Sequence, residues 1–246
     1  MSAGVLVTGA GGFIGAALVR RLLRDGLGGQ PLRRLVALDL ALPGPPDLPD
    51  DPRLRRVEGS VADPAVLAQA LAARPDLVFH LASVPGGAAE RDPDLSRRVN
   101  LDGTRRLLDQ LRRQGDAPRL VFASTVAVYG DPLPPRVDED TPAAPAMTYG
   151  AHKLAAEVLV ADATRRGGVR GLSLRLPGVV ARPGDGEGLV SAFMSRLFWR
   201  LRDGLPVELP VTADGRAWWI SRDACIDNLL HAATLDPGAA GPRGVV

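Results

Sequence analysis

A glycine-rich turn near the start of the chain constrains its fold more than any other feature. The apolar run from residue 4 to 8 has the character of a buried parallel strand. Gly9, Gly12 and Gly15 follow with the spacing G-x-x-G-x-x-G, and a helical pattern extends from Phe13 to about Asp25. The first glycine permits a tight turn, the second lets backbone N–H groups approach a pyrophosphate, and the third allows close packing of helix on strand. The segment therefore predicts a dinucleotide-binding strand–turn–helix unit.

Strand and helix patterns alternate through the rest of the first 177 residues. Further strands are expected at residues 34–40, 54–59, 76–81, 119–124 and 171–176, with helices beginning near Asp63-Pro64, spanning 93–114 and containing Tyr149. This alternation predicts an α/β fold with a doubly wound, parallel, Rossmann-type sheet. Ligands of such sheets bind outside the carboxyl ends of the strands. Asp39, Ser83, Thr125 and Pro177 all fall at or just beyond such ends.

The pattern loosens from about residue 178 onward. A helix is expected at 189–202, a short strand near 206–209 and a late helix at 221–235. We therefore expect a Rossmann domain over residues 1–177 and a small C-terminal substrate-binding region over 178–246, with the late helix packing back on the Rossmann core. The last four residues have the pattern of the beginning of another strand.

Composition narrows the classes of function. The formal net charge is +2, and no basic block with interleaved aromatic residues favours nucleic-acid binding. The apolar runs are too short to cross a bilayer, and no signal-peptide pattern precedes the first strand. Cys225 is the single cysteine, which excludes an internal disulfide and fits a buried residue in a reducing cytosol. We expect a cytoplasmic protein without a metal cluster.

Tyr149 and Lys153 are the strongest candidates for chemistry. Four residues apart on a helix, their side chains lie one turn apart on the same face. Lys153 is the only lysine in a chain that otherwise uses arginine. A lysine ammonium beside a phenol stabilises the phenolate and lowers its pKa, which suits Tyr149 to acid/base catalysis near neutral pH. The alternative is an ordinary surface pair.

Asp39, at the end of the second expected strand, bears on cofactor choice. A carboxylate there can accept both hydroxyl groups of an adenosine ribose. It would also repel a 2′-phosphate, so NAD is favoured over NADP. The alternative is an aspartate of the loop that follows the strand.

These segments together resemble the extended short-chain dehydrogenase/reductases, the group that contains the NAD-dependent epimerases and dehydratases. The resemblance is carried by residues 8–15, Asp39, and residues 80–83, 100–104, 124–130 and 149–153. It implies that Thr125 binds the reacting oxygen, Tyr149 is the acid/base, Lys153 holds the nicotinamide ribose and Asn100 helps to position the site. Ser124, beside Thr125, is expected to be structural. The implied NAD contacts are Gly9, Gly12, Phe13, Ile14, Gly15, Asp39, Ser60, Val61, Leu81, Ala82, Ser83, Tyr149, Lys153 and Pro177.

Within that family, the chain is most similar to members that oxidise a four-carbon sugar acid at C2. The similarity lies in residues 79–84, 98–104, 174–177, 180–184 and 228–232. It implies an NAD-dependent oxidoreductase acting on the C2 hydroxyl of a small sugar acid, and a homodimer packed through the helices that carry Asn100 and Tyr149. The implied substrate contacts are Ser83, Thr125, Tyr149, Arg182 and Arg216, where either arginine is alternatively a solvated surface residue.

Some positions depart from the family pattern. Ser60 stands where many relatives place an aspartate for the adenine amine, and Gly178 lacks the side chain with which sugar-nucleotide epimerases hold their substrate. Relatives usually continue beyond the point that corresponds to Val246, so a shortened substrate-binding region is expected. Gly178 argues against a nucleotide-sugar epimerase or dehydratase, which is the enzyme alternative. The expected shortening is the reason for the other alternative, a catalytically weak NAD-binding protein. His80 is expected to pack or hydrogen bond at a strand end, and His152 to be exposed.

Overall fold

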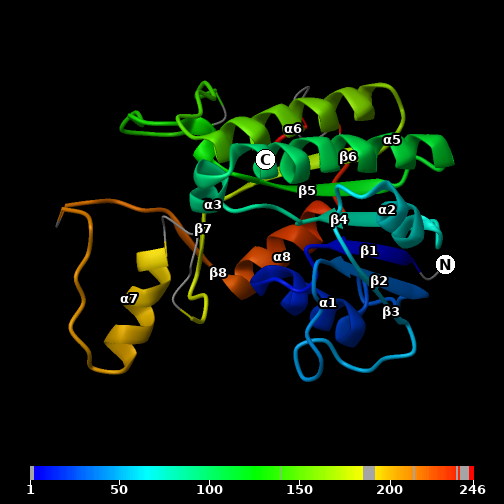
Figure 1. Cartoon of the computed structure of the whole chain (residues 1–246), viewed down its shortest axis with the longest axis horizontal. Helices are drawn as coiled ribbons and strands as arrows, with labels where there is room; N and C mark the ends of the chain where they lie inside the picture. Colours follow the sequence, from blue (N-terminus) through cyan, green and yellow to red (C-terminus); the bar gives the residue numbers. More distant parts are fainter. Residues whose placement is uncertain (1–2, 139, 185–191, 213, 237, 239–243) are drawn as a thin grey trace.

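A six-stranded parallel sheet forms the centre of the molecule (Figure 1), in a computed structural model that describes residues 3–138, 140–184, 192–212, 214–236, 238 and 244–246. Its strands stand in the order β3-β2-β1-β4-β5-β6, the order of a classical doubly wound Rossmann sheet. They are β1 Gly4–Thr8, β2 Arg34–Asp39, β3 Leu54–Glu58, β4 Leu77–His80, β5 Arg119–Thr125 and β6 Arg170–Leu176. The predicted fold class is confirmed.

Alternate strand residues serve two hydrophobic cores, one on each face of the sheet. Val5 and Val7 of β1 enter the core beneath α1 Phe13–Asp25 and α8 Arg222–Ala232. Leu6, between them, enters the core beneath α2 Pro64–Leu71, α5 Thr104–Gln114 and α6 Thr148–Arg165. Because both faces are covered, the strands read as continuous apolar runs rather than as alternating patterns. Cys225 of α8 is fully buried in the first core, and burial raises the pKa of its thiol to about 12.

The connection from β4 to β5 differs from the single helix expected over 93–114. It consists of α3 Gly86–Arg91, α4 Pro93–Ser96, a π-helical segment Arg97–Gly103, and α5. Asn100 lies in the π-helical segment and is buried. Widened turns of this kind occur mostly at functional sites.

The part after β6 is only partly as expected. A parallel pair, β7 Gly178–Val180 with β8 Trp219–Ser221, was not predicted. Helix α7 Ala192–Arg202 stands apart from the sheet (Figure 1), and residues 189–191 of the predicted helix lie outside the described residues. The strand predicted at 206–209 is wrong: these residues form no strand. Pro206 lacks an N–H, and its carbonyl accepts a bond from Arg200 Nε at 2.6 Å rather than from a neighbouring strand.

The late helix and the final residues return to the Rossmann core. α8 follows the Ser221 N-cap, ends at Ala232 rather than Leu235, and packs on α1 and β6. Val245 forms a parallel bridge with Ser173 of β6, as the pattern of an incipient strand predicted. Among the described residues, no helix is both long enough and apolar enough to span a membrane.

Candidate active site

The carboxyl ends of β1 and β4 meet at the point where the strand order reverses, and two glycines make that meeting possible. Gly9 has a φ of +72°, and a Cβ there would lie 2.7 Å from the backbone nitrogen of Ala82. A Cβ at Gly15 would overlap the carbonyl oxygen of Gly9. Helix α1 begins after Gly12, which offers no side-chain cap, so the N–H groups of the first turn are free to meet an anion. The turn fits a pyrophosphate.

Asp39, at the end of β2, lies against this turn. Its Oδ2 accepts a hydrogen bond from the Gly11 backbone nitrogen at 2.9 Å, and its Oδ1 accepts one from Leu40 at 2.7 Å. The carboxylate is thereby fixed beside the glycine turn, where it can face a ribose. Beyond β3, Ser60 is half-buried and Val61 is buried.

His80, fully buried at the end of β4, joins the glycine turn to the π-helical segment. Thr8 Oγ1 lies 2.7 Å from Nδ1, and Nε2 lies 2.9 Å from Thr104 Oγ1. Thr104 donates onward to the Asn100 carbonyl at 2.7 Å, and the Ala82 backbone nitrogen donates to Thr8 at 3.3 Å. This pattern assigns the ring proton to Nε2. Burial lowers the pKa of His80 to about 3, so the ring is a neutral hydrogen-bonding link, in line with its expected role.

Asn100 holds the segment that carries Ser83. Its Oδ1 accepts from the Val84 backbone nitrogen at 2.7 Å, and its Nδ2 donates to the Val84 carbonyl at 3.0 Å. Nδ2 also lies 3.1 Å from Ser96 Oγ, which is 2.9 Å from His152 Nδ1 on α6. The prediction of an exposed His152 is therefore wrong: the ring is half-buried because Ser96 anchors it, and burial lowers its pKa.

Tyr149 lies in the first turn of α6, and an element distant in sequence fixes the start of this helix. Its N-cap residue, Met147, has no capping side chain; instead the Thr148 backbone nitrogen donates to Glu90 Oε1 of α3 at 2.6 Å. The hydroxyl groups of Ser83 and Thr125 lie close enough to the Tyr149 phenol to lower its pKa. Phenol and hydroxyls thus converge where a substrate oxygen would react.

The pKa values at this point correct one prediction. Burial raises the pKa of Tyr149, whereas the Tyr–Lys spacing predicted a lowered one. The groups that oppose the rise are the Ser83 and Thr125 hydroxyls and the charge of Arg182. Lys153 Nζ lies 5.9 Å from the centre of the Tyr149 ring and donates to the Ala123 carbonyl at 2.6 Å, and burial lowers its own pKa to about 7.

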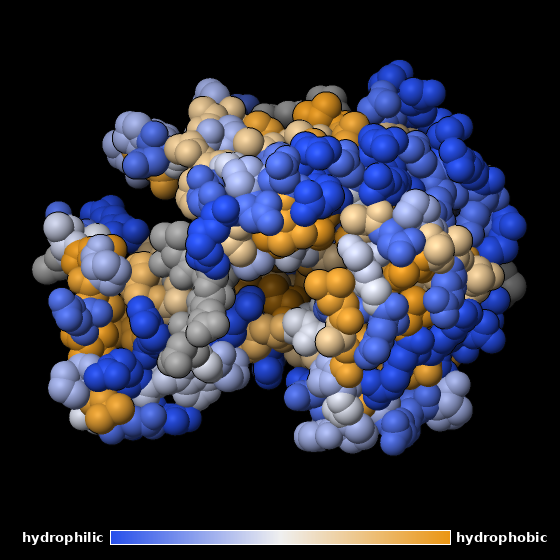
Figure 2. Space-filling model, in the orientation of Figure 1, coloured by the Kyte–Doolittle hydropathy of each residue, from blue (hydrophilic) through white to orange (hydrophobic). Residues whose placement is uncertain are grey.

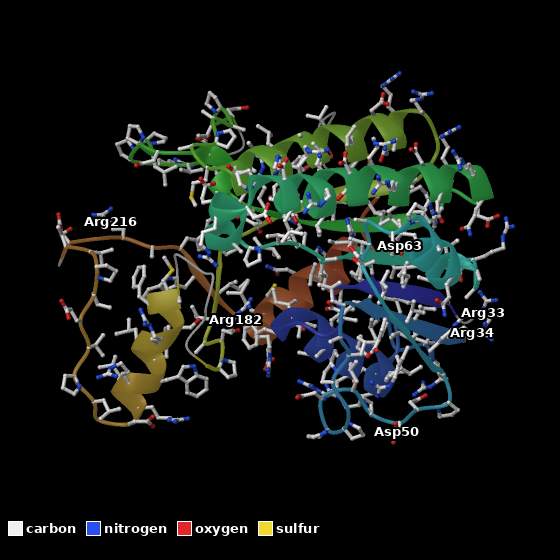
Figure 3. All side chains as sticks on the ribbon, in the orientation of Figure 1. Arg33, Arg34, Asp50, Asp63, Arg182 and Arg216 are labelled. Atoms are coloured by element: carbon white, nitrogen blue, oxygen red, sulfur yellow. The ribbon has the colours of Figure 1, made fainter. Side chains whose placement is uncertain are left out.

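The structure brings Arg182 to the site and leaves Arg216 outside it. The Arg182 guanidinium lies 5.4 Å from the centre of the Phe13 ring, beside the glycine turn. Its backbone is held by α7, because Ser195 Oγ accepts from the Arg182 nitrogen at 3.0 Å and Trp199 Nε1 donates to its carbonyl at 2.7 Å. Arg216 is exposed on the far side of α7 (Figure 3).

The remaining predicted residues lie at the same edge of the sheet. Ile14 and Leu81 are partly buried against the core beneath α1, and Pro177 is half-buried between β6 and β7. Figure 2 shows a hollow between the part that carries α7 and the Rossmann body, with apolar residues at its floor.

Several residues at the site were not predicted from the sequence. Glu90 acts from another helix, and no local pattern links it to Tyr149. Arg222 of α8 places its guanidinium 5.3 Å from the centre of the Phe13 ring. Glu157 is buried one turn beyond Lys153 and pairs with Arg175. Only Glu157 carried a local signal, because it continues the four-residue interval from Tyr149 through Lys153.

Comparison with known proteins identifies the family of the chain. The model of the "NAD dependent epimerase/dehydratase family" matches residues 5–235. The chain belongs to that family. Its cofactor is therefore NAD, as Asp39 and the glycine turn predicted.

Two relatives are named D-erythronate dehydrogenase. The protein of Cupriavidus necator is 42% identical over 98% of this chain and 75% of its own length. The protein of Haemophilus influenzae is 32% identical over 94% of this chain and 72% of its own. A crystal structure described as a nucleoside-diphosphate-sugar epimerase from Agrobacterium tumefaciens superposes with a TM-score of 0.91 at 34% identity, over all of this chain and 73% of that one. The resemblance predicted from the sequence is confirmed.

Proposed function

We propose that the protein is an NAD-dependent dehydrogenase that oxidises the C2 hydroxyl of D-erythronate to 2-oxo-erythronate. The observation that carries the proposal is that Lys153 Nζ lies 5.9 Å from the centre of the Tyr149 ring, with Ser83, Thr125 and Arg182 close enough to the phenol to lower its pKa. The names of the two relatives supply the substrate. The same chemistry extends to other small 2-hydroxy acids.

The residues divide the reaction between proton transfer and orientation. Tyr149, as phenolate, removes the C2 hydroxyl proton, while Thr125 and Ser83 hold the substrate oxygen in line. NAD, when bound, accepts the hydride that leaves C2. Lys153 holds the nicotinamide ribose and supplies positive charge beneath Tyr149. Asn100 acts through Val84 by keeping the Ser83 segment in place.

The cofactor contacts follow from the same edge of the sheet. The first turn of α1, with Phe13 and Ile14, faces the pyrophosphate, and Asp39 accepts the adenosine ribose hydroxyls. Ser60 and Val61 line the adenine side, and Leu81, Ala82 and Pro177 line the nicotinamide side. In this assignment residues 1–177 bind the cofactor and residues 178–246 supply substrate contacts. A homodimer through the helical segments that carry Asn100 and Tyr149 remains a prediction.

Arg182 is the partner that we assign to the substrate carboxylate. Its charge acts on the Tyr149 phenol, and α7 holds its backbone from both sides. Arg182→Gln is expected to raise KM for D-erythronate at least about tenfold with a smaller effect on kcat, because a charge-assisted bond is lost. Arg216→Gln is the matched control and should leave both constants unchanged. Equal effects of the two substitutions would remove Arg182 from this role.

The function is tested by NADH formation with purified protein. The substrates are D-erythronate, L-threonate, D-glycerate and a UDP-sugar, each with wild type and with Tyr149→Phe. Rapid NADH formation from D-erythronate that the variant loses supports the proposal. NAD binding without NADH from any hydroxy acid would overturn it and favour a catalytically weak NAD-binding protein.

A nucleotide-sugar epimerase is the second candidate, because the Agrobacterium tumefaciens structure carries that description. Gly178 weighs against it. A Cβ at this position would lie 3.2 Å from Trp219 Cδ1 and 3.3 Å from Met194 Sδ, so a substrate-holding side chain here would require these two side chains to shift. An epimerase would interconvert the UDP-sugar without net release of NADH, so analysis of the sugar products of the same incubations distinguishes it from an inactive NAD-binding protein.

A further inference from the structure

A row of three ionisable side chains runs along the inner face of α6. Tyr149, Lys153 and Glu157 follow at intervals of four residues, which places them on one side of the helix. Lys153 is 2% exposed and Glu157 is 3% exposed. Charged side chains are rarely buried to this extent unless they are paired. Lys153 and Glu157 differ in the partners that surround their charged groups.

Glu157 is fully paired. Arg175 of β6 donates from Nε to Oε1 at 3.0 Å and from Nη2 to Oε2 at 2.7 Å, and Ser124 Oγ also bonds to Oε1. The Arg175 guanidinium lies 4.9 Å from the centre of the Tyr129 ring, and its side chain is 8% exposed. Two-point bonding of this kind fixes the carboxylate in one orientation.

Lys153 makes weaker contacts. Its Nζ donates to the Ala123 carbonyl at 2.6 Å and lies 4.6 Å from the centre of the Phe122 ring. Among the described residues, no carboxylate lies within ion-pair distance of Nζ. Ala123 and Ser124 are consecutive on β5, so one strand aligns Lys153 and Glu157 side by side.

We propose that Glu157 is a positioning residue of the active site, whose carboxylate, oriented by Arg175 and Ser124, favours the charged form of the buried Lys153. The inference rests on the proposed function, because a charged Lys153 matters there as the cation that favours the Tyr149 phenolate. Ser124 thereby gains a defined structural role in supporting Glu157.

The charges around Lys153 explain why the carboxylate is needed. Burial lowers the pKa of Lys153, and Glu157 is the charged group that raises it. Three other ionisable groups surround Lys153. Tyr149 lies on the same helix, and His80 faces Lys153 from β4 as a neutral ring. Arg175 on β6 is hydrogen bonded to Glu157, which carries the carboxylate nearest to it. Without the carboxylate, Lys153 and Arg175 would be two buried cations. Arginine stays protonated, so Lys153 would lose its proton more readily.

The only lysine of the chain provides a direct test. Protein labelled with ¹³C-lysine gives the side-chain signals of one residue, and their chemical shifts report the protonation of Lys153 as pH is raised. Glu157→Gln keeps the size of the side chain and is expected to lower the midpoint by at least about one pH unit, which is a tenfold change in the protonation equilibrium. Arg175→Gln should raise the midpoint, because the carboxylate is no longer neutralised. The double variant should return close to wild type.

A bridge that merely supports the fold predicts otherwise. If the Glu157–Arg175 ion pair only supports the fold, the midpoint of Lys153 should stay unchanged in both single variants or move in the same direction in both. Either result overturns the proposal. If Glu157→Gln does not fold, Arg175→Gln provides the test: a raised Lys153 midpoint supports the proposal, and an unchanged or lowered midpoint overturns it. The NMR readout needs no substrate, so it stands apart from the dehydrogenase assay. The pH profile of kcat/KM is the second readout: its acidic limb should move to higher pH in Glu157→Gln and return in the double variant.

Discussion

At the scale of single residues, we propose that Asp39 determines the preference for NAD over NADP. Its two carboxylate oxygens accept backbone hydrogen bonds from Gly11 and Leu40, which fixes a negative charge beside the turn that faces the cofactor. A 2′-phosphate would meet that charge directly. A neutral side chain of the same size removes the repulsion and keeps an acceptor for one of the two N–H groups.

Asp39→Asn is therefore expected to narrow the preference for NAD over NADP by at least about tenfold, measured as the ratio of kcat/KM for the two cofactors. Asp50→Asn, in the exposed loop after β2, is the matched control and should leave the ratio unchanged. A ratio that stays constant in Asp39→Asn would show that another group excludes NADP.

At the scale of elements, the start of α6 depends on α3. Glu90 Oε1 accepts from the Thr148 backbone nitrogen at 2.6 Å, at a helix end whose own N-cap residue has no capping side chain. A carboxylate at this end also interacts favourably with the positive end of the helix dipole. Since Tyr149 belongs to the first turn, this contact positions the phenol that we propose as the base.

Glu90→Ala is expected to reduce the free energy of unfolding by about 1 kcal/mol, the usual value of an N-cap contact, and to lower kcat/KM. Glu90→Gln retains an acceptor oxygen and should lie closer to wild type in both measurements. Denaturant unfolding and steady-state kinetics check the pair. Equal losses in the two variants would argue against capping and for a role of the charge alone.

Elements were predictable where the local pattern determines them. Each predicted end of β1 to β6 lies at or within one residue of the observed end, because buried parallel strands are bounded apolar runs. Strands β7 and β8 are only three residues long and pair across about forty residues of chain, so neither has a recognisable period. At the π-helical turn, the Asn100 carbonyl accepts a local bond from the Thr104 hydroxyl, and the Asn100 side chain accepts a bond from the distant Val84 backbone nitrogen.

The candidate site shows the same limit. The glycine turn, Asp39 and the Tyr149–Lys153 pair could be predicted because the spacing itself has a physical meaning. Glu90 and Arg175 could not, since their partners lie on other elements. The sequence alone did not distinguish Arg182 from Arg216 as the expected substrate contact. In the structure Arg182 lies beside the glycine turn and Arg216 is exposed away from it.

At the scale of the whole molecule, buried His80 makes stability depend on pH. Its pKa is lowered from 6.5 to about 3 by burial, so the unfolded chain binds a proton between these values that the folded chain does not. Stability contributed by the neutral ring is present above pH 6.5 and is lost as pH falls toward 3.

Between pH 7 and pH 5 the free energy of unfolding of wild type is therefore expected to fall by about 2 kcal/mol more than that of His80→Gln. This is the free energy that the unfolded chain gains over that interval by protonating a histidine with a pKa of 6.5. Glutamine offers both a donor and an acceptor but does not titrate. Urea unfolding at the two pH values measures the difference. Parallel losses in both proteins would mean that His80 is protonated in the folded state.

The proposed reaction transfers hydride from C2 of a sugar acid to NAD. The most direct measurement uses D-erythronate deuterated at C2, with the reduced cofactor analysed by mass spectrometry. The deuterium is expected in the reduced cofactor, and Tyr149→Phe, with NAD still bound, is expected to form about 10² to 10⁴ times less of it per unit time. Reduced cofactor without deuterium would place the oxidation at another carbon and overturn the proposed reaction.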